Sequence, residues 1–234
     1  MKRTPWNVAL PSRPTSRRPA SLGQLRFNST KPSLPKLTHI DDNGRPSMVD
    51  VSQKQPTSRM ATATGRIYLP RVAYDLVTSS STPSPTDANI LPSLEKAKAK
   101  ARAKGDVLTV AQLAGIMACK RTADLIPLCH PLPLSHVSVT LMPEEHAHED
   151  AAPSAHGLRH SIICRATVSC DGRTGVEMEA LTAVSVGLLT VWDMLKAVAG
   201  KEMLIGDVLV SHKAGGKSGD FIRHGCTGAG GEDV

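Results

Sequence analysis

Two oppositely charged side chains, Asp193 and Lys196, lie in an otherwise apolar stretch of the chain and could carry proton-transfer chemistry. Their i,i+3 spacing places them on one face of a helix. An apolar environment would raise the pKa of the carboxyl group and lower that of the amine, whereas mutual pairing opposes both shifts. Such a pair, when partly shielded from water, is a good acid/base unit. The alternative is an ordinary ion pair on the surface of a helix.

Carboxylate, thiol and imidazole groups also occur in two other apolar stretches. Glu177 and Glu179 begin a long apolar segment. There they either complement the positive end of a helix, or do acid/base work or grip a donor-rich ring such as guanine. Cys129 and His130 lie in the apolar run Leu125–Leu132, between two prolines. The imidazole is either a general acid or ligand, or a hydrogen-bonded structural histidine.

The segment Lys213–Gly219 contains two lysines among glycines, a composition that can hold a polyphosphate. It is no Walker A loop, because that motif requires glycine where Ser211 stands. A flexible glycine-rich chain end is the alternative interpretation.

The spacing of these groups bears on how a site could be built. Glu179 and Asp193 are 14 residues apart, which is ~21 Å along a continuous helix. If both act on one substrate, either the helix starts after Glu179 and the chain bends there, or the site is shared between subunits. We predict a site at a homo-oligomer interface, so that mixing two inactive variants, one altered at each position, should restore some activity.

Hydrophobic periodicity predicts the elements that position these residues. Alternation predicts four strands, at Arg59–Leu69, Leu134–Leu141, His160–Cys170 and Met203–Val210. A helix capped by Asp106 should run to about Lys120, and a second should span Val176–Val198. The order strand, helix, strand, strand, helix, strand predicts an α+β fold of the ferredoxin-like βαββαβ type, an antiparallel sheet with two helices on one face.

Three further features of these elements are expected. The first helix should present one apolar face made of Val110, Leu113, Ala114 and Met117. Leu94–Lys104 is either a basic surface helix or a flexible arm. Residues 78–93 and 143–157 should be polar loops.

Charge is distributed unevenly along the chain. Residues 1–40 hold eight of the 28 Lys and Arg residues and none of the 21 acids, so the remainder carries 20 basic against 21 acidic residues. This leader has the composition of a mitochondrial presequence, which predicts the mitochondrial matrix, although its prolines also fit a solvated basic tail. A near-neutral body weakens a nucleic-acid function. No apolar run approaches the ~20 residues of a membrane-spanning helix, so no membrane partner is expected.

Long runs of the sequence together resemble the MoaC family, the cyclic pyranopterin monophosphate synthases of molybdenum cofactor biosynthesis. The matching runs are Met48–Lys54 (MVDVSQK), Lys104–Val139, Thr174–Val198 (with TGVEMEAL) and Lys213–Phe221 (KAGGKSGDF). The resemblance implies a ferredoxin-like domain over 48–221, with a Ser/Pro-rich insertion at about 70–95 and a disordered tail at 222–234. It also implies a hexamer, a trimer of dimers, with the active site at a subunit interface.

The resemblance implies conversion of a cyclised nucleotide, 3′,8-cyclo-7,8-dihydroguanosine 5′-triphosphate, to cyclic pyranopterin monophosphate and diphosphate. A radical SAM enzyme would supply that substrate. By position, the catalytic residues would be Asp193, Lys196 and Lys104, and the substrate-binding residues Leu128, Cys129, His130, Glu177, Met178, Glu179 and Lys213. No metal-ligand set is evident and no cofactor is expected, although Mg²⁺ could accompany the triphosphate.

Two other functions remain as alternatives. RNA recognition motifs share the βαββαβ topology, but they stack bases on aromatic side chains, and the predicted strand His160–Cys170 has none. The second alternative is a catalytically silent subunit that serves only assembly.

Overall fold

A computed structural model of the chain describes residues 38–78, 92–146, 157–216 and 219–223. The leader up to residue 37, the centre of the Ser/Pro-rich insertion, the middle of the 143–157 loop and the chain end from 224 lie outside the described residues. The predictions for those segments are therefore not addressed by the structure.

One antiparallel sheet organises the described part of the chain. Its strands are β1 (Thr57–Leu69), β2 (Leu134–Glu145), β3 (His160–Gly172), β4 (Leu204–Ala214) and β5 (Phe221–Ile222). The strands lie in the order β2-β3-β1-β4-β5, and each neighbouring pair is antiparallel. Without the two-residue β5, this is the strand order expected of a βαββαβ unit, and the predicted ferredoxin-like α+β fold is confirmed.

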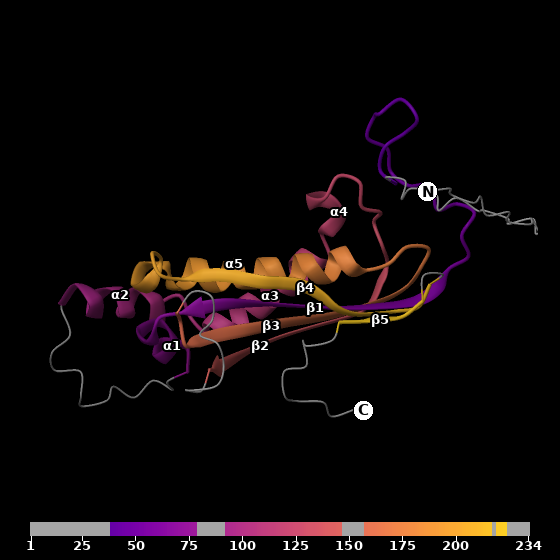
Figure 1. Ribbon diagram of the computed structural model, residues 1–234. Helices are drawn as coiled ribbons and strands as arrows, with labels where there is room; N and C mark the ends of the chain where they lie inside the picture. Colours follow the sequence, from indigo (N-terminus) through magenta and orange to yellow (C-terminus); the bar gives the residue numbers. More distant parts are fainter. Residues whose placement is uncertain (1–37, 79–91, 147–156, 217–218, 224–234) are drawn as a thin grey trace, which may run out of the picture. The chain divides into compact units, whose positions relative to one another are not determined.

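The helices are α1 (Arg71–Thr78), α2 (Pro92–Arg102), α3 (Val107–Cys119), α4 (Thr122–Leu125) and α5 (Glu177–Ala199). α3 and α5 run along one face of the sheet, with α5 packed on β1 and β3 and α3 on β2 (Figure 1). The Asp106 carboxylate caps α3 as predicted, because it accepts hydrogen bonds from the backbone N–H groups of Leu108 and Thr109. Leu94–Lys104 largely forms the helix α2, one of the two alternatives.

The core lies between α5 and the sheet. Leu188 and Leu195 of α5, Ile67 of β1 and Ile162 of β3 are fully buried there. Contrary to the expectation that no apolar run approaches the length of a membrane span, α5 is long and apolar enough to pass as one by length and composition alone. Its apolar side chains instead fill the core, and it also carries Glu177 and Asp193. It therefore serves as the central helix of this domain.

The residues of the predicted apolar face of α3 do share one face of the helix, but that face is not buried in the core. Val110, Leu113 and Met117 are 40%, 59% and 49% exposed. The helix instead turns its small residues inward, and a Cβ added at Gly115 would lie 2.9 Å from the backbone oxygen of Ala183 in α5. α3 and α5 thus approach too closely for large side chains, which leaves the larger ones on the outside.

Two segments expected to be irregular are regular. Residues 71–78, inside the expected insertion at about 70–95, form α1, because Tyr74 is buried with its ring 4.7 Å from that of His160. β2 continues through Glu145, beyond the predicted end at Leu141. That extension pairs with β3, and its Glu144 accepts a hydrogen bond from Arg66 Nε at 2.9 Å.

Candidate active site

The predicted site residues gather at the two ends of α5. The helix is continuous from Glu177 to Ala199, so a bend after Glu179 is excluded. The N-terminal group contains Leu128, Cys129, His130, Glu177, Met178, Glu179 and Lys213; the C-terminal group contains Lys104, Asp193 and Lys196. A single chain therefore does not bring all ten residues together.

Six of the seven N-terminal residues line one pocket, which we call the apolar pocket. The 128–130 segment, which follows α4, forms one wall, and the first turn of α5 forms another. Val49, Val51 and Leu132 complete much of its apolar lining. The pocket thus combines an apolar surface with a thiol, an imidazole and two carboxyl groups.

Glu179 is the buried acid of this pocket. It is 4% exposed, and its Oε2 atom is buried with no hydrogen-bond partner among the described residues. Burial raises the pKa of its carboxyl group, and the nearby charge of Glu177 adds to this, while a backbone hydrogen bond opposes it. Burial and the Glu179 charge also raise the pKa of the Cys129 thiol, which argues against a thiolate nucleophile. Glu179 is suited to hydrogen-bond a donor-rich ring.

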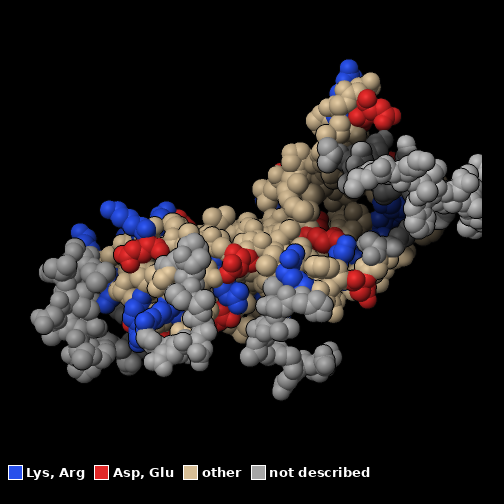
Figure 2. Space-filling model, viewed as in Figure 1, with Lys and Arg blue, Asp and Glu red and all other residues tan. Residues whose placement is uncertain are grey.

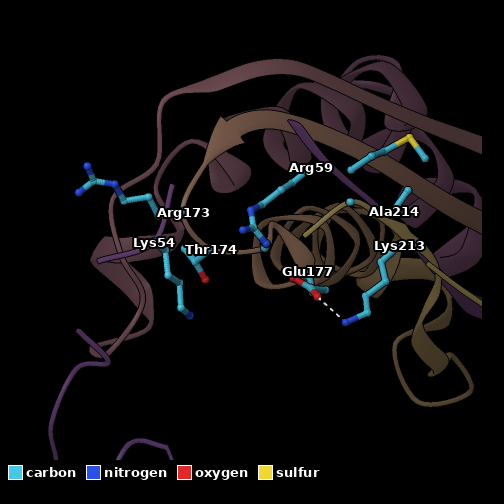
Figure 3. Close-up of a pocket in the computed structure, with 10 residues that line it drawn as sticks. Lys54, Arg59, Arg173, Thr174, Glu177, Lys213 and Ala214 are labelled. Carbon is cyan, nitrogen blue, oxygen red and sulfur yellow. Dashed lines mark ion pairs between the residues drawn. The ribbon is translucent and has the colours of Figure 1, made fainter. Parts of the chain in front are cut away.

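Glu177 lines both the apolar pocket and a second, basic pocket, and the residues that line the basic pocket are drawn in Figure 3. The Glu177 carboxylate folds back over Gly175, where an added Cβ would lie 1.9 Å from Oε2. Its Oε1 atom pairs with Lys213 Nζ at 3.3 Å. Lys213 is the second-last residue of β4, so the predicted glycine-rich segment begins inside a strand and is no P-loop.

The basic pocket contains cations that the sequence analysis did not single out. Lys54, Arg59 and Arg173 line it together with Lys213 and Glu177. In Figure 3 the side chains of Arg59 and Lys213 reach toward Glu177, whereas Arg173 points away from the group. Lys54 could have been predicted as a site residue, because it belongs to the run Met48–Lys54 that resembles the family. The place of Arg59 in the pocket depends on the register of β1, which the sequence does not give.

Lys104, Asp193 and Lys196 do converge. Lys196 Nζ lies 2.5 Å from Asp193 Oδ1, and Lys104 Nζ lies 3.7 Å from Oδ2. Lys104 also donates a hydrogen bond to the backbone oxygen of Asp193 at 2.6 Å, which fixes its position although the insertion precedes it in sequence. The hydrogen bond and charge of Lys196, and then the charge of Lys104, lower the pKa of Asp193.

The predicted acid/base pair, Asp193 and Lys196, is not shielded from water in a single chain. The side chains of Asp193 and Lys196 are 63% and 57% exposed. The pKa of Asp193 is therefore lowered by pairing with Lys196 and not raised by an apolar environment. The apolar neighbours in sequence had suggested such an environment. The neighbours Met194 and Leu195 point into the core, and the charged pair points out of it.

Within the described ranges, no group of three or more His, Cys, Asp or Glu side chains could hold a metal ion. The cations of the basic pocket could instead offset the charge of a phosphate chain directly.

Comparison with known proteins shows the family to which the chain belongs. Residues 48–216 match the MoaC family. A protein named cyclic pyranopterin monophosphate synthase from Campylobacter jejuni subsp. jejuni is 44% identical over 188 residues, which cover 80% of this chain and 99% of the relative. Proteins of the same name from Nocardioides sp. and Herpetosiphon aurantiacus are 46% identical over 188 residues and 44% identical over 185. These alignments cover 80% and 79% of this chain, and 96% and 93% of the two relatives.

The matched residues include every strand from β1 to β4, both core helices and both groups of site residues. The match covers most of the described chain, and the chain belongs to the MoaC family.

Proposed function

We propose that the chain is a lyase of molybdenum cofactor biosynthesis that converts the cyclised dihydroguanosine triphosphate to cyclic pyranopterin monophosphate and diphosphate. The family match and the 42–46% identity to synthases of that name support this activity. The structural observation that carries it is the buried carboxyl of Glu179, whose Oε2 has no hydrogen-bond partner among the described residues, in an apolar pocket that adjoins a basic one. A guanine-derived ring and a phosphate chain need these two surroundings side by side.

The reaction requires proton transfers and one displacement at phosphorus. Opening of the pyrimidine ring and formation of the pyrazine ring need an acid and a base, and we assign these roles to Asp193 and Lys196. A ribose-derived hydroxyl then attacks the α-phosphorus, loses its proton, and the bond to the departing diphosphate breaks. Lys104, Lys213 and His130 would offset the charge that develops there.

The geometry of α5 favours a site shared between two chains. Glu179 and Asp193 are separated by ~21 Å of continuous helix, so a second copy in the opposite direction would bring the N-terminal group of one chain to the C-terminal group of the other. The exposed Val110, Leu113 and Met117 of α3 offer an apolar surface for such a contact. The hexamer, a trimer of dimers, is the assembly we propose.

Turnover of the cyclised nucleotide, followed by pterin fluorescence and released diphosphate, tests the activity. Replacing Asp193 by Asn should abolish turnover while the circular dichroism spectrum and melting temperature stay unchanged. Glu202→Gln is the matched control, since it removes one exposed carboxylate just beyond the end of α5. Near-normal turnover by Asp193→Asn would refute the role of that residue. Absence of turnover by the unaltered protein would favour the silent assembly subunit.

The open face of the sheet does not favour RNA binding. The central strands are β1 and β3. Their one Phe, Tyr or Trp ring, that of Tyr68, is 8% exposed and its hydroxyl donates a hydrogen bond to Asp207, and the His160 side chain of β3 is 14% exposed. Stacking of bases on exposed rings, which RNA recognition motifs require, has no platform there. Lys/Arg and Asp/Glu are interspersed over the face in view, apart from Lys and Arg gathered over α2 (Figure 2). We propose that neither nucleic acid nor a membrane is a partner.

Three further proposals concern the cellular setting. The basic leader would direct the chain to the mitochondrial matrix, which a reporter fused to residues 1–40 tests; a cytosolic reporter would refute it. A radical SAM enzyme would supply the substrate. Mg²⁺ would enter only with the triphosphate, so chelation should change turnover without unfolding the protein.

A further inference from the structure

Two pockets meet at one carboxylate. The apolar pocket and the basic pocket share Lys54, Thr174, Gly175 and Glu177 in their linings. A ligand can therefore occupy both pockets at once if it has a flat ring with N–H donors at its edge and a polyanionic chain. Glu177 lies where the two parts of such a ligand would join.

The basic pocket is built to receive an anion. Arg59 is held in place because its Nε donates a hydrogen bond to the backbone oxygen of Gly172 at 2.8 Å. The chain after β4 passes directly against the same guanidinium, since a Cβ added at Gly216 would lie 2.4 Å from Nη1. A fixed guanidinium with two lysines, Lys54 and Lys213, is a typical phosphate-binding set.

One of these cations is already engaged. Lys213 pairs with Glu177 at 3.3 Å, and both side chains are only about one-third exposed, at 30% and 33%. Partial burial strengthens their attraction relative to a surface pair. A phosphate chain entering the pocket must therefore compete with Glu177 for Lys213 and also approach a carboxylate of its own sign.

We propose that the basic pocket is the subsite for the phosphate chain and that Glu177 withholds Lys213 from it until a nucleobase in the apolar pocket engages the Glu177 carboxylate. This inference rests on the proposed function, because it assigns the two ends of that substrate. Ring N–H donors would replace Lys213 as the partner of Glu177. Base recognition and phosphate binding then become one coupled event.

Coupling of this kind is reciprocal and measurable. If guanosine raises the affinity for inorganic diphosphate, diphosphate raises the affinity for guanosine by the same factor. Coupling between adjacent sites typically amounts to about 5–150-fold. We expect at least fivefold for these two ligands, measured by calorimetry at one fixed ionic strength because anion binding is screened by salt.

The test uses the full chain with inorganic diphosphate as probe, with and without saturating guanosine. The unaltered protein should bind diphosphate more tightly when guanosine is present. Glu177→Gln should bind it tightly without guanosine and gain nothing further, since the uncharged amide neither forms an ion pair with Lys213 nor repels the anion. Glu177→Asp, whose shorter carboxylate retains the charge at the start of α5, should show an intermediate effect and guards against misfolding of the first variant.

Arg59→Met should weaken diphosphate binding about tenfold under both conditions, whereas Arg71→Met, the control on the remote helix α1, should not. Equal diphosphate affinity with and without guanosine would overturn the proposal, as would weaker binding by Glu177→Gln or no measurable binding at all. None of these results would touch the proposed function, because turnover of the cyclised nucleotide is measured separately.

Discussion

Mixing of inactive variants gives the sharpest test of the shared site. Asp193→Asn removes the proposed acid/base group at one end of α5, and Glu179→Gln removes the buried acid at the other. Because ~21 Å of helix separates them, each site would take one group from each of two chains. Random pairing of equal amounts makes half of the pairs mixed, and each mixed pair has one intact site and one doubly altered site. Restored turnover should therefore reach about 25% of that of the unaltered protein.

The assay mixes the two unfolded variants, refolds them together and measures pterin fluorescence per chain. A mixture of Asp193→Asn with Lys196→Met is the matched control, because both changes lie in the same half of the site and no mixed pair contains an intact one. The reasoning is refuted if the first mixture stays as inactive as its components while the refolded unaltered protein is fully active. Restoration in the control mixture would refute the assignment of the two halves.

Further predictions concern stability and thiol reactivity. Because the pKa of Glu179 is raised, the folded protein binds a proton there more tightly than the unfolded chain does. The free energy of unfolding therefore falls as the pH rises above about 4.5, the ordinary pKa of a glutamate carboxyl. Glu179→Gln should therefore unfold at higher urea concentration than the unaltered protein at pH 7, with the difference shrinking toward pH 4; an unchanged difference would contradict burial of the charge. Gly215→Ala should cost roughly 1–3 kcal/mol of unfolding free energy, because φ is +84° and the added Cβ would lie 2.1 Å from the Ser58 oxygen; urea titration checks it. Burial raises the pKa of Cys119 and Cys164 to about 12, so a thiol reagent at pH 8 should label both only after unfolding, and rapid native labelling would argue against their burial.

Much of the fold follows from local sequence patterns, since period-2 alternation predicts β1 and the Asp106 cap marks the start of α3. The same patterns cannot say which face of a helix meets its neighbour. On α3, large apolar residues predict the buried face, yet Gly115 and the small residues around it face α5 because the two backbones approach closely. The outward position of Leu113 is a property of packing between helices distant in sequence.

The positions of the candidate site residues were predictable to a similar extent. Residue type and spacing find the pair Asp193 and Lys196, and the matching of long runs finds Lys104, which the structure places beside them. The sequence left open whether the pair is shielded or exposed, because core helices alternate buried and exposed positions within a few residues; in a single chain the structure shows the surface alternative. The cations Lys54 and Arg59 escape notice for a related reason: their proximity to Lys213 depends on strand order and register.

The two groups of candidate site residues, one at each end of α5, differ in how far a single chain shields them from water. Glu179 is already desolvated, so its carboxyl is ready to hydrogen-bond a ring as soon as one enters. Asp193 is exposed and its pKa is lowered by Lys196 and Lys104, so in a single chain it is a weakly basic carboxylate held by two ammonium groups. If a second chain covered the Asp193 carboxylate, the loss of water around it would raise its pKa and so oppose the effect of the two lysines. Proton transfer should therefore depend on association, whereas ring binding should not, and dilution below the dissociation constant of the assembly should abolish turnover before it abolishes binding of guanosine.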